Sequence, residues 1–502
     1  MSKEKIRDLE SLKKFLKNNV RNPVFGVGVH AFNRLGLENV LPKYRIITLR
    51  YSLDTALIEK DMEVFSLEKG MGTKHINAPR NSTTVLCHPR TQTYLNSFKE
   101  QPVIIPYKAS YKMERVCQKN NWILAASGTR FGKALFEDKI KFRRILEKIG
   151  IAVPPGETAR FKNLNYKELR EKYGLPFVIQ HPRRGGGKGT FFIKNEDNFK
   201  NAFQKIAKSE DEDSPTKENL EKLELIVAKF IKGSSPSIIG CVTRHGILMT
   251  TLQHQVLDIP ECYNPEKGSG LFCGHDWTAS RFSDDVYNVA FEYVEKIGKY
   301  FQKNGYKGIF GIDMVLEKDT NKLYVVEANP RLVAQFPTIL MAQFLNNEPL
   351  ILAFHLLEYL RIDYNIDVAQ INKLMQQPKK GAHLFLHNLS GRWARNKKTI
   401  RAGVYVLRGN ELQYKRPGYD LKHIKNNDEF IITESVPLLN SYFSPNRRLV
   451  RILTLKSVIK KHDKLNNWAQ KVVTITYNAF CLKPIRFFKI IRFFNPNYLV
   501  KG

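Results

Sequence analysis

Hydrophobic and polar positions along the first quarter of the chain alternate in short blocks. Apolar runs in RIITLR, MEVFSLE, STTVLCHP and QPVIIPY are each followed by polar or helical stretches, so strands and helices are expected to take turns from about residue 20 to 125. This pattern predicts an open α/β layer. A helix over residues 134–150 follows, because apolar side chains recur at helical spacing from Phe142 to Ile149 and Gly150 marks the end.

The next region, residues 126–360, is expected to fold as one domain with two subdomains. The smaller subdomain covers about 175–232, where the strands LPFVIQ and TFFIKN flank a glycine-rich turn and an acidic helical stretch leads to the strand LELIVAKFI. The larger one contains further strands, a long helix over about 284–304 and a β hairpin. The chain therefore belongs to the mixed α/β and α+β multidomain class.

The last part of the chain changes character twice. Strands in GAHLFLHN, AGVYVLRG, ELQYKR and EFIITESVP, separated by turn residues, predict a small β domain over residues 380–450. Residues 451–502 form a basic and aromatic tail, and from position 446 onward thirteen Lys and Arg residues stand against one acid, Asp463. The tail suits an interfacial helix on an anionic membrane surface, and equally a helix packed onto the β domain.

Candidate chemistry concentrates in the hairpin GIDMVLEKDTNKLYVVEANPR. A turn centred near Thr320 places Asp313 directly across from Glu327, and strand alternation points Asn329 to the same face as Glu327. Facing carboxylates repel one another, so a shared hard cation explains them, and oxygen ligands suit Mg²⁺ or Mn²⁺. Arg331 follows and is placed to hold an anion beside that cation. The alternative is an amphipathic hairpin with a solvated acidic face.

A second candidate is the run RRGGGKG from Arg183 to Gly189, which lies between two predicted strands. A turn between strands differs from the strand-to-helix loops of the Rossmann and Walker motifs, so neither of those is expected. Glycine backbone N–H groups can approach phosphate oxygens closely, and Lys188 adds a positive charge. The run predicts a triphosphate loop, with a basic surface turn as the alternative.

These segments resemble an ATP-grasp enzyme when they are taken in order. The motifs occur in the order found in that family: Asp138-Lys139, the run PFVIQHPRRGGGKG, the strand IVAKFI, Asp313, and the run EANPR from Glu327. The resemblance covers roughly residues 20–345. The chain is most similar to the branch that holds biotin carboxylase, carbamoyl phosphate synthetase and amino-acid or peptide ligases. The resemblance implies an α/β layer, called the pre-ATP-grasp domain, followed by two subdomains that clasp ATP.

The resemblance also implies roles for individual residues. Lys139 and Lys188 would contact the ATP phosphates, the backbone from Lys229 to Ile231 would bind adenine, and Arg331 would steady the transferred phosphate or a carboxylate. Lys188 and Arg331 are the expected catalytic residues. The expected ATP-binding and metal-binding positions are Lys139, Gln180, Gly185, Gly186, Gly187, Lys188, Gly189, Lys229 and Ile231 for ATP, and Asp313, Glu327 and Asn329 for one or two Mg²⁺.

The implied reaction is an ATP-dependent ligation of a carboxylate to an amine through an acyl phosphate, on an amino-acid-like or peptide substrate. Lysines, an arginine and magnesium suffice for it, because phosphoryl transfer depends on positioning and charge neutralisation. A closed lid over the glycine loop would exclude water. The segment Leu332–Gln335 lacks the polar residues with which biotin carboxylases receive bicarbonate, so carboxylation is disfavoured.

One departure from the family keeps another class of function open. Gln180 stands where many members carry a second phosphate-binding lysine, so a neutral amide replaces a cation, although Arg183, Arg184 or Lys188 could compensate. The alternative is a catalytically weak ATP-binding protein that acts as a basic module for an anionic membrane or partner. His181, His254, His275 and Asp276 are candidates for binding only, since a single histidine is more often structural.

Composition adds limits on partners and compartment. The formal net charge of +33 favours an anionic partner, but the lysines are spread widely, and no nucleic-acid-binding module accompanies them. Six cysteines show neither metal-site spacing nor a disulfide framework, which favours a reducing compartment. The first twenty residues lack the apolar core of a secretory signal. A cytoplasmic location is expected, at the inner face of the membrane if the tail binds lipid.

Overall fold

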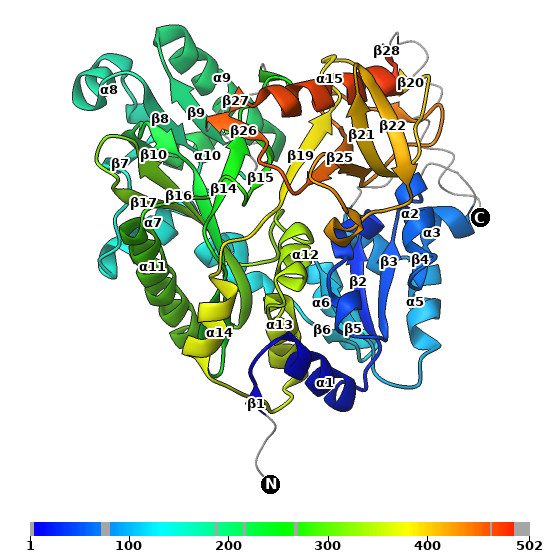
Figure 1. Cartoon of the computed structure of the whole chain (residues 1–502). Coiled ribbons are helices and arrows are strands. Elements are labelled where there is room, and N and C mark those ends of the chain that lie inside the picture. Colours follow the sequence, from blue (N-terminus) through cyan, green and yellow to red (C-terminus); the bar gives the residue numbers. More distant parts are fainter. Residues whose placement is uncertain are drawn as a thin grey trace.

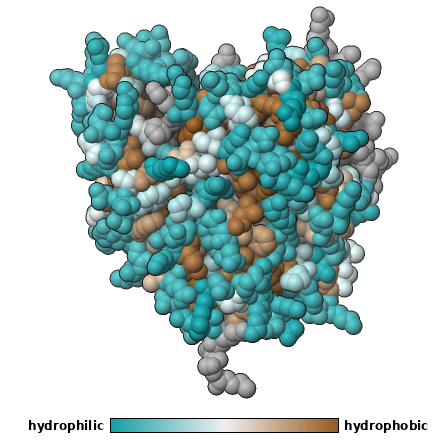
Figure 2. Space-filling model, viewed as in Figure 1, coloured by the Kyte–Doolittle hydropathy of each residue, from teal (hydrophilic) through white to brown (hydrophobic). Residues whose placement is uncertain are grey.

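The computed structural model describes residues 5–71, 81–185, 189–213, 217–265, 270–461 and 464–485. Figure 1 shows the N-terminal α/β layer at the lower right, the C-terminal strands above it, and the smaller subdomain at the upper left. Figure 2 shows that the outline is notched between this subdomain and the C-terminal strands. The predicted positions Gly186, Gly187 and Lys188, and the tail beyond residue 485, lie outside the described residues.

The N-terminal layer is a parallel five-stranded sheet in the order β4-β3-β2-β5-β6, which confirms the predicted open α/β arrangement. Its strands are β2 (Val24–Gly28), β3 (Tyr44–Thr48), β4 (Val64–Ser66), β5 (Val103–Pro106) and β6 (Ile123–Leu124). The strand expected in STTVLCHP is wrong: Ser82–Leu86 forms helix α4. The Asn81 side chain accepts a hydrogen bond from the Thr84 amide at 3.0 Å and caps this helix, which outweighs the strand preference of its β-branched residues.

Helix α7 (Lys139–Lys148) carries the start of the second domain and begins later than the predicted residue 134. The Asp138 carboxylate caps its N-terminus by accepting hydrogen bonds from the amides of Ile140 and Lys141, both at 3.1 Å. The preceding residues Gly132–Phe136 form a separate π-helical turn. The cap therefore fixes where the helix starts and places Lys139 in its first turn.

The smaller subdomain, which we call the lid, contains an antiparallel sheet in the order β7-β10-β8-β9. Strands β8 (Phe177–Gln180) and β9 (Thr190–Ile193) flank the glycine loop as predicted, and β10 (Glu224–Lys229) lies beside β8. The fourth strand, β7 (Gly156–Arg160), comes before the expected limit at residue 175, so the lid begins earlier than the sequence suggested. Helix α9 (Glu196–Asp213) accounts for the predicted helical stretch.

The larger subdomain and the C-terminal strands share one twelve-stranded sheet. Strand β15 (Phe272–Asp276) pairs with β19 (Ala382–His387), and β19 pairs with β25 (Arg448–Thr454), which continues to β23 (Phe430–Thr433) and β21 (Gly403–Arg408). The predicted boundary at residue 450 therefore falls inside a central strand. The expected β domain is an extension of the same sheet, seen in Figure 1 where β19 joins β15.

The described part of the predicted tail packs onto this extension. Helix α15 (Asn467–Phe480) buries an apolar side formed by Ala469, Val472, Val473 and Phe480. The segment KPIRFFKIIRFF, on which the choice between a membrane-bound and a packed helix rests, lies mostly beyond residue 485 and so outside the described residues. No helix among the described segments is both long enough and apolar enough to cross a bilayer.

A buried carboxylate joins the N-terminal layer to the C-terminal strands. Asp54, in helix α2 (Leu53–Ile58), is fully buried and accepts a hydrogen bond from the Val436 amide at 2.9 Å. Burial raises the pKa of Asp54 from its ordinary 3.8 to about 6. The folded protein therefore holds this proton more tightly than the unfolded chain does, and the ionised group costs stability as the pH rises from about 4 to 6.

The Asp54→Asn variant is expected not to lose stability in this way as the pH rises, because asparagine does not ionise. Between about pH 4 and pH 7 the free energy of unfolding should shift in the variant's favour by about 3 kcal/mol relative to wild type, from roughly two pKa units at about 1.4 kcal/mol each. Urea unfolding at both pH values measures it. Asp319→Asn, in the exposed β16–β17 turn, is the control. An Asp54→Asn difference that stays constant with pH would contradict the assignment.

Candidate ATP and metal site

The predicted hairpin forms, with β16 (Gly308–Glu317) and β17 (Leu323–Asn329) joined by the expected polar turn. Its register pairs Asp313 with Glu327, as the sequence predicted, and pairs Gly311 with Asn329. A shift in register follows Asp313, where β17 carries one extra residue. Asp313, Glu327 and Asn329 therefore share one face of neighbouring strands.

Asp313 is held by two amide side chains. Asn329 Nδ2 donates to its Oδ2 at 2.9 Å, and Gln255 Nε2, from β14 (Gln253–Leu257), donates to its Oδ1 at 2.5 Å. Burial, and then the negative charge of Glu327, raise the pKa of Asp313 to about 7. This is the response expected when a buried carboxylate faces a second carboxylate. We did not predict Gln255 from the sequence. Its place on a strand with alternating side chains indicates that it can point to the sheet face that carries Asp313.

Lys139 connects the metal hairpin with the glycine loop. Its ammonium group lies 2.9 Å from Glu327 Oε2 and donates to the Arg184 carbonyl at 2.9 Å, and the side chain is only 4% exposed. Arg183 in turn pairs with Asp138 at 3.0 Å. The start of the glycine loop is thus tied to α7 and, through Lys139, to the candidate metal ligands.

Arg331 connects the same hairpin with the N-terminal layer. Its guanidinium donates to Asn329 Oδ1 at 2.5 Å, to Glu137 Oε1 at 3.2 Å and to the Tyr107 hydroxyl. Lys108 also pairs with Glu137. Tyr107, Lys108 and Glu137 were not predicted; the available signal was that Tyr107 and Lys108 directly follow β5, where parallel sheets bind ligands.

One face of the lid sheet lies toward helix α7. Along β8, Phe177 and Ile179 are buried in the lid core, so Gln180 belongs to the opposite face, where it pairs in register with Ile226 of β10. Ile226 shares a small buried cluster with Ile140 of α7. Gln180 Nε2 donates to Thr190 Oγ1 at 3.3 Å, so its amide faces the loop strands.

One backbone donor of the predicted adenine-binding segment is already used in a hydrogen bond within the protein. The Lys229 amide donates to the Pro155 carbonyl at 2.8 Å, which removes one of the expected donors. Ile231 follows β10 and is 8% exposed. Its backbone remains the stronger candidate for adenine.

The described ends of the glycine loop show why glycine is needed. At Gly189 an added Cβ would come within 2.5 Å of Arg184 Cβ, and the Gly189 carbonyl accepts from the His181 amide at 2.7 Å. At Gly185 an added Cβ would meet nothing within 4 Å, so this end of the loop is open. The turn is therefore closely packed at Gly189 and open at Gly185.

His275 and Asp276 lie in β15 and not in a substrate loop. His275 is buried, and its Nδ1 lies 3.3 Å from His383 Nε2. Burial lowers the pKa of His275 well below its ordinary value, so the ring is neutral. The Asp276 carboxylate accepts from Ser457 Oγ at 2.8 Å and from the Val458 amide at 2.7 Å, which ties the extended sheet together. Both residues are structural.

His181, at the base of the glycine loop, and His254, in β14 of the large sheet, are also buried. The His181 ring accepts a hydrogen bond through Nδ1 from the Arg183 amide at 3.1 Å, so it shapes the loop base. The His254 ring packs on Phe282 at 4.5 Å.

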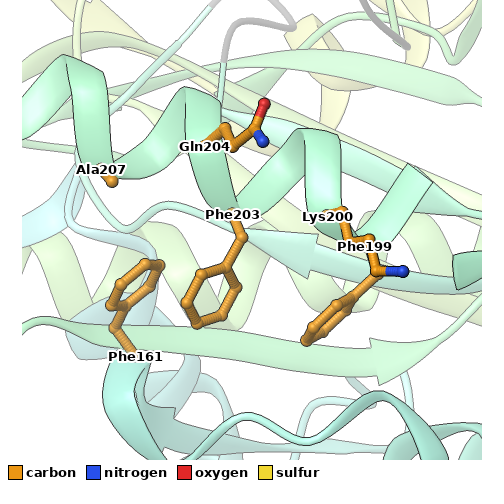
Figure 3. A pocket seen from close by; sticks show the side chains of 6 residues that line it. All are labelled: Phe161, Phe199, Lys200, Phe203, Gln204 and Ala207. Carbon is orange, nitrogen blue, oxygen red and sulfur yellow. The ribbon is translucent and has the colours of Figure 1, made fainter. Parts of the chain in front are cut away.

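A pocket of about 500 Å³ on the lid lies apart from these residues. Figure 3 shows Phe161, Phe199 and Phe203 beneath α9, and the Phe161 and Phe203 rings stack at 3.9 Å. None of the predicted site residues lines this pocket. The pocket is therefore a gap in the aromatic packing of the lid and not the candidate ATP site.

The candidate ligands fit a hard divalent cation better than a transition metal. Across the described ranges there is no group of three His, Cys, Asp or Glu side chains placed to hold a metal. The hairpin instead offers two carboxylates and one amide, all oxygen donors, and nucleotide phosphates would supply further oxygens. This donor set suits Mg²⁺ or Mn²⁺ bound together with a nucleotide.

Comparisons with known proteins agree with this geometry. Residues 136–335 match the sequence profile of the ATP-grasp domain. The large chain of carbamoyl phosphate synthase from Haemophilus ducreyi is 25% identical over 48% of this chain and 21% of its own length. D-alanine–D-alanine ligase from Carboxydothermus hydrogenoformans is 26% identical over 43% of this chain and 66% of its own. The matches thus span less than two thirds of these relatives.

A solved structure extends the similarity to nearly the whole fold. Biotin carboxylase from Campylobacter jejuni, in complex with an ATP compound, superposes with a TM-score of 0.57 at 13% identity, over 95% of this chain and 96% of the other. This likeness shows that the chain shares the fold of that structure. Residues 136–335 form an ATP-grasp domain.

Proposed function

We propose that this protein is an ATP-dependent carboxylate–amine ligase that acts through an acyl phosphate. The observation that carries the proposal is the chain of contacts around Glu327. Through Lys139 it reaches the glycine loop, and across the hairpin it faces Asp313, whose neighbour Asn329 binds Arg331. Groups that handle phosphate, cation and acceptor are thus joined within one cluster.

Each residue has a definite task in this reaction. Lys139 and the glycine loop bind the phosphates, and Ile231 offers its backbone to adenine. Asp313, Glu327 and Asn329 would hold one or two Mg²⁺, which would supply charge neutralisation at the phosphates. Arg331 lies toward the N-terminal layer, where it can orient the acceptor carboxylate or the transferred phosphoryl group.

The electron balance needs no protein nucleophile. A carboxylate oxygen of the acceptor attacks the γ-phosphorus and the bond to the β–γ bridging oxygen breaks, which releases ADP and forms an acyl phosphate. The amine then attacks the activated carbonyl, loses a proton and expels phosphate. The lid protects the acyl phosphate from water during the interval.

An isotope experiment tests the proposal directly. Purified protein is supplied with ATP, Mg²⁺ and a panel of amino acids and short peptides whose carboxylates carry heavy oxygen. An acyl phosphate transfers one labelled oxygen to the released phosphate, and mass spectrometry detects it. ADP release without label transfer for any accepted acid would show that ATP is split by another route.

A substitution at Gln180 tests whether its neutral amide weakens ATP binding. Because Gln180 faces the loop strands as a neutral donor, Gln180→Lys should add a charged contact to phosphate and tighten ATP binding by about tenfold. Calorimetric titration with ATP measures this. Thr158→Lys, on edge strand β7 across β10 from Gln180, controls for added charge on the lid.

Two results of the Gln180→Lys titration would matter. If Gln180→Lys binds ATP more tightly but turns over at the wild-type rate, Gln180 limits ATP affinity and not the chemical step. No change in affinity would show that the side chain at position 180 does not reach the phosphates, and the corresponding binding assignment would be wrong.

A further inference from the structure

A second pocket, of about 330 Å³, lies between the N-terminal layer and the C-terminal strands. The N-terminal layer contributes residues that follow its strands, and the C-terminal strands contribute the start of β25. We call it the interdomain pocket, and its principal polar lining residues are Arg50, Ser52, Lys69, Ser441, Arg447 and Arg448.

The position of the pocket is one where open parallel sheets bind ligands. The strand order β4-β3-β2-β5-β6 reverses direction at β2, and ligands bind outside the carboxyl ends of strands near such a reversal. Arg50 follows β3, and Tyr107, which binds Arg331, follows β5. The pocket and the candidate catalytic arginine therefore belong to the same edge of the sheet.

Cations around the interdomain pocket exceed the carboxylates that neutralise them. Arg50 pairs with Glu68 and Lys69 with Glu59, both at 2.8 Å. The buried Glu434 is shared by two arginines, Arg448 and Arg451, each at 2.5 Å. Among the described residues, five cations including Arg447 thus lie beside four carboxylates, because the buried Asp54 is close to Glu434.

Arg447 is the cation left over. Among the described residues its guanidinium has no ion pair or hydrogen bond, although Arg50 and Arg448 lie near enough to act on it. Burial, followed by the positive charges of these two arginines, lowers the pKa of Arg447 against a smaller opposing effect of Glu434. A half-buried guanidinium crowded by like charges is unfavourable unless an anion joins it.

Arg34 provides a second, independent observation. It ends the short helix Ala31–Arg34 after β2, is 6% exposed, and its Nε and Nη1 are buried without a hydrogen-bond partner in the described chain. Tyr44, Tyr107 and Glu434 act on it electrostatically, so it lies near the Tyr107 that binds Arg331 and near the Glu434 that Arg448 and Arg451 share. An unpaired buried guanidinium costs free energy that an anion would recover.

We infer that the interdomain pocket binds the anionic group of the acceptor, a phosphate or a carboxylate on a small molecule, with Arg447 as its main ligand. The identification of this ligand as the acceptor rests on the proposed ligase function, whereas the anion site itself does not. Arg447 and Arg34, which have no ion pair in the described chain, together match the charge of a phosphate dianion or of two carboxylates. An acceptor anchored there would lie at the same carboxyl edge of the N-terminal sheet as Tyr107, which binds Arg331.

The test uses the full-length protein with saturating ADP and Mg²⁺, so that the nucleotide site is filled. Calorimetry follows titration with inorganic phosphate and, separately, with succinate. Wild type should bind at least one of them, and Arg447→Gln should weaken binding by about tenfold or more, because a charge-assisted contact is lost. Arg408→Gln, an exposed arginine at the end of β21, should bind as wild type does.

Thermal unfolding guards against a variant that merely misfolds. Arg447→Gln removes like-charge repulsion, so without added anion its melting temperature should equal or exceed that of wild type. The bound anion should raise the melting temperature of wild type and of Arg447→Lys, but not that of Arg447→Gln.

Each outcome has one reading. Phosphate binding that depends on Arg447 assigns a phosphorylated acceptor, and succinate binding that depends on it assigns a carboxylated one. If neither anion binds wild type, or if Arg447→Gln binds as tightly, the inference is overturned. Anion binding without any ATP turnover would leave this site standing while the ligase proposal fails, so the two can be told apart.

Discussion

Glu327→Gln is expected to lower kcat/KM for ATP-dependent turnover by about a thousandfold or more. Loss of a magnesium ligand removes transition-state stabilisation of several kcal/mol, and about 4 kcal/mol corresponds to three powers of ten in rate. Glutamine keeps an oxygen acceptor for the Lys139 ammonium, which lies 2.9 Å from Glu327 and is nearly buried. The variant should therefore fold, and coupled-enzyme detection of ADP measures its activity.

A matched substitution on the same hairpin isolates the role of Glu327. Glu317→Gln also replaces a glutamate on the hairpin with its amide, but Glu317 contacts Thr320 in the turn and not Lys139. It should keep wild-type activity. Raising the Mg²⁺ concentration should partly restore Glu327→Gln if the defect is in metal binding. Full activity of Glu327→Gln at ordinary Mg²⁺ would remove this residue from the metal site.

Arg331→Lys is expected to lower kcat by about a hundredfold to a thousandfold while ATP affinity changes little. Lysine keeps the charge, but it cannot reproduce the planar set of N–H groups that reach Asn329, Glu137 and Tyr107 together. Losing one preoriented donor to a transition state has an effect of this size. Steady-state kinetics combined with ATP titration separates the two quantities.

The control for Arg331 is a second arginine at a structural ion pair. Arg143 lies on α7 and pairs with Glu147 at 3.0 Å, so Arg143→Lys changes the same side chain away from the hairpin. It should retain kcat. If Arg331→Lys weakened ATP binding and left kcat unchanged, Arg331 would be a nucleotide ligand and not a group that acts on the transferred phosphoryl.

Features that depend on neighbouring residues could be predicted from the sequence. The pairing of Asp313 with Glu327 follows from a polar turn and strict alternation on two strands, and both are local. The two strands around the glycine loop are likewise set by short apolar runs. The ATP-grasp domain was recognised because these local motifs occur in a particular order, and residues 136–335 match the domain profile.

Features that depend on distant contacts could not be predicted. Tyr107 meets Arg331 across 224 positions in the chain, and no local pattern connects them. The same holds for the pairing of β15 with β19, which merges the predicted β domain into the larger sheet. STTVLCHP was misassigned because β-branched residues favour strands, whereas the Asn81 cap determines the helix.

The interpretation of the site depends on a divalent ion that bridges ATP and the hairpin. An electron paramagnetic resonance titration with Mn²⁺ and ATP, on wild type and on Glu327→Gln, measures that ion directly. Wild type should bind Mn²⁺ tightly when ATP is present, and Glu327→Gln should bind it at least about tenfold more weakly, since one charged ligand is lost. Equal Mn²⁺ affinity in the two proteins would contradict the central claim.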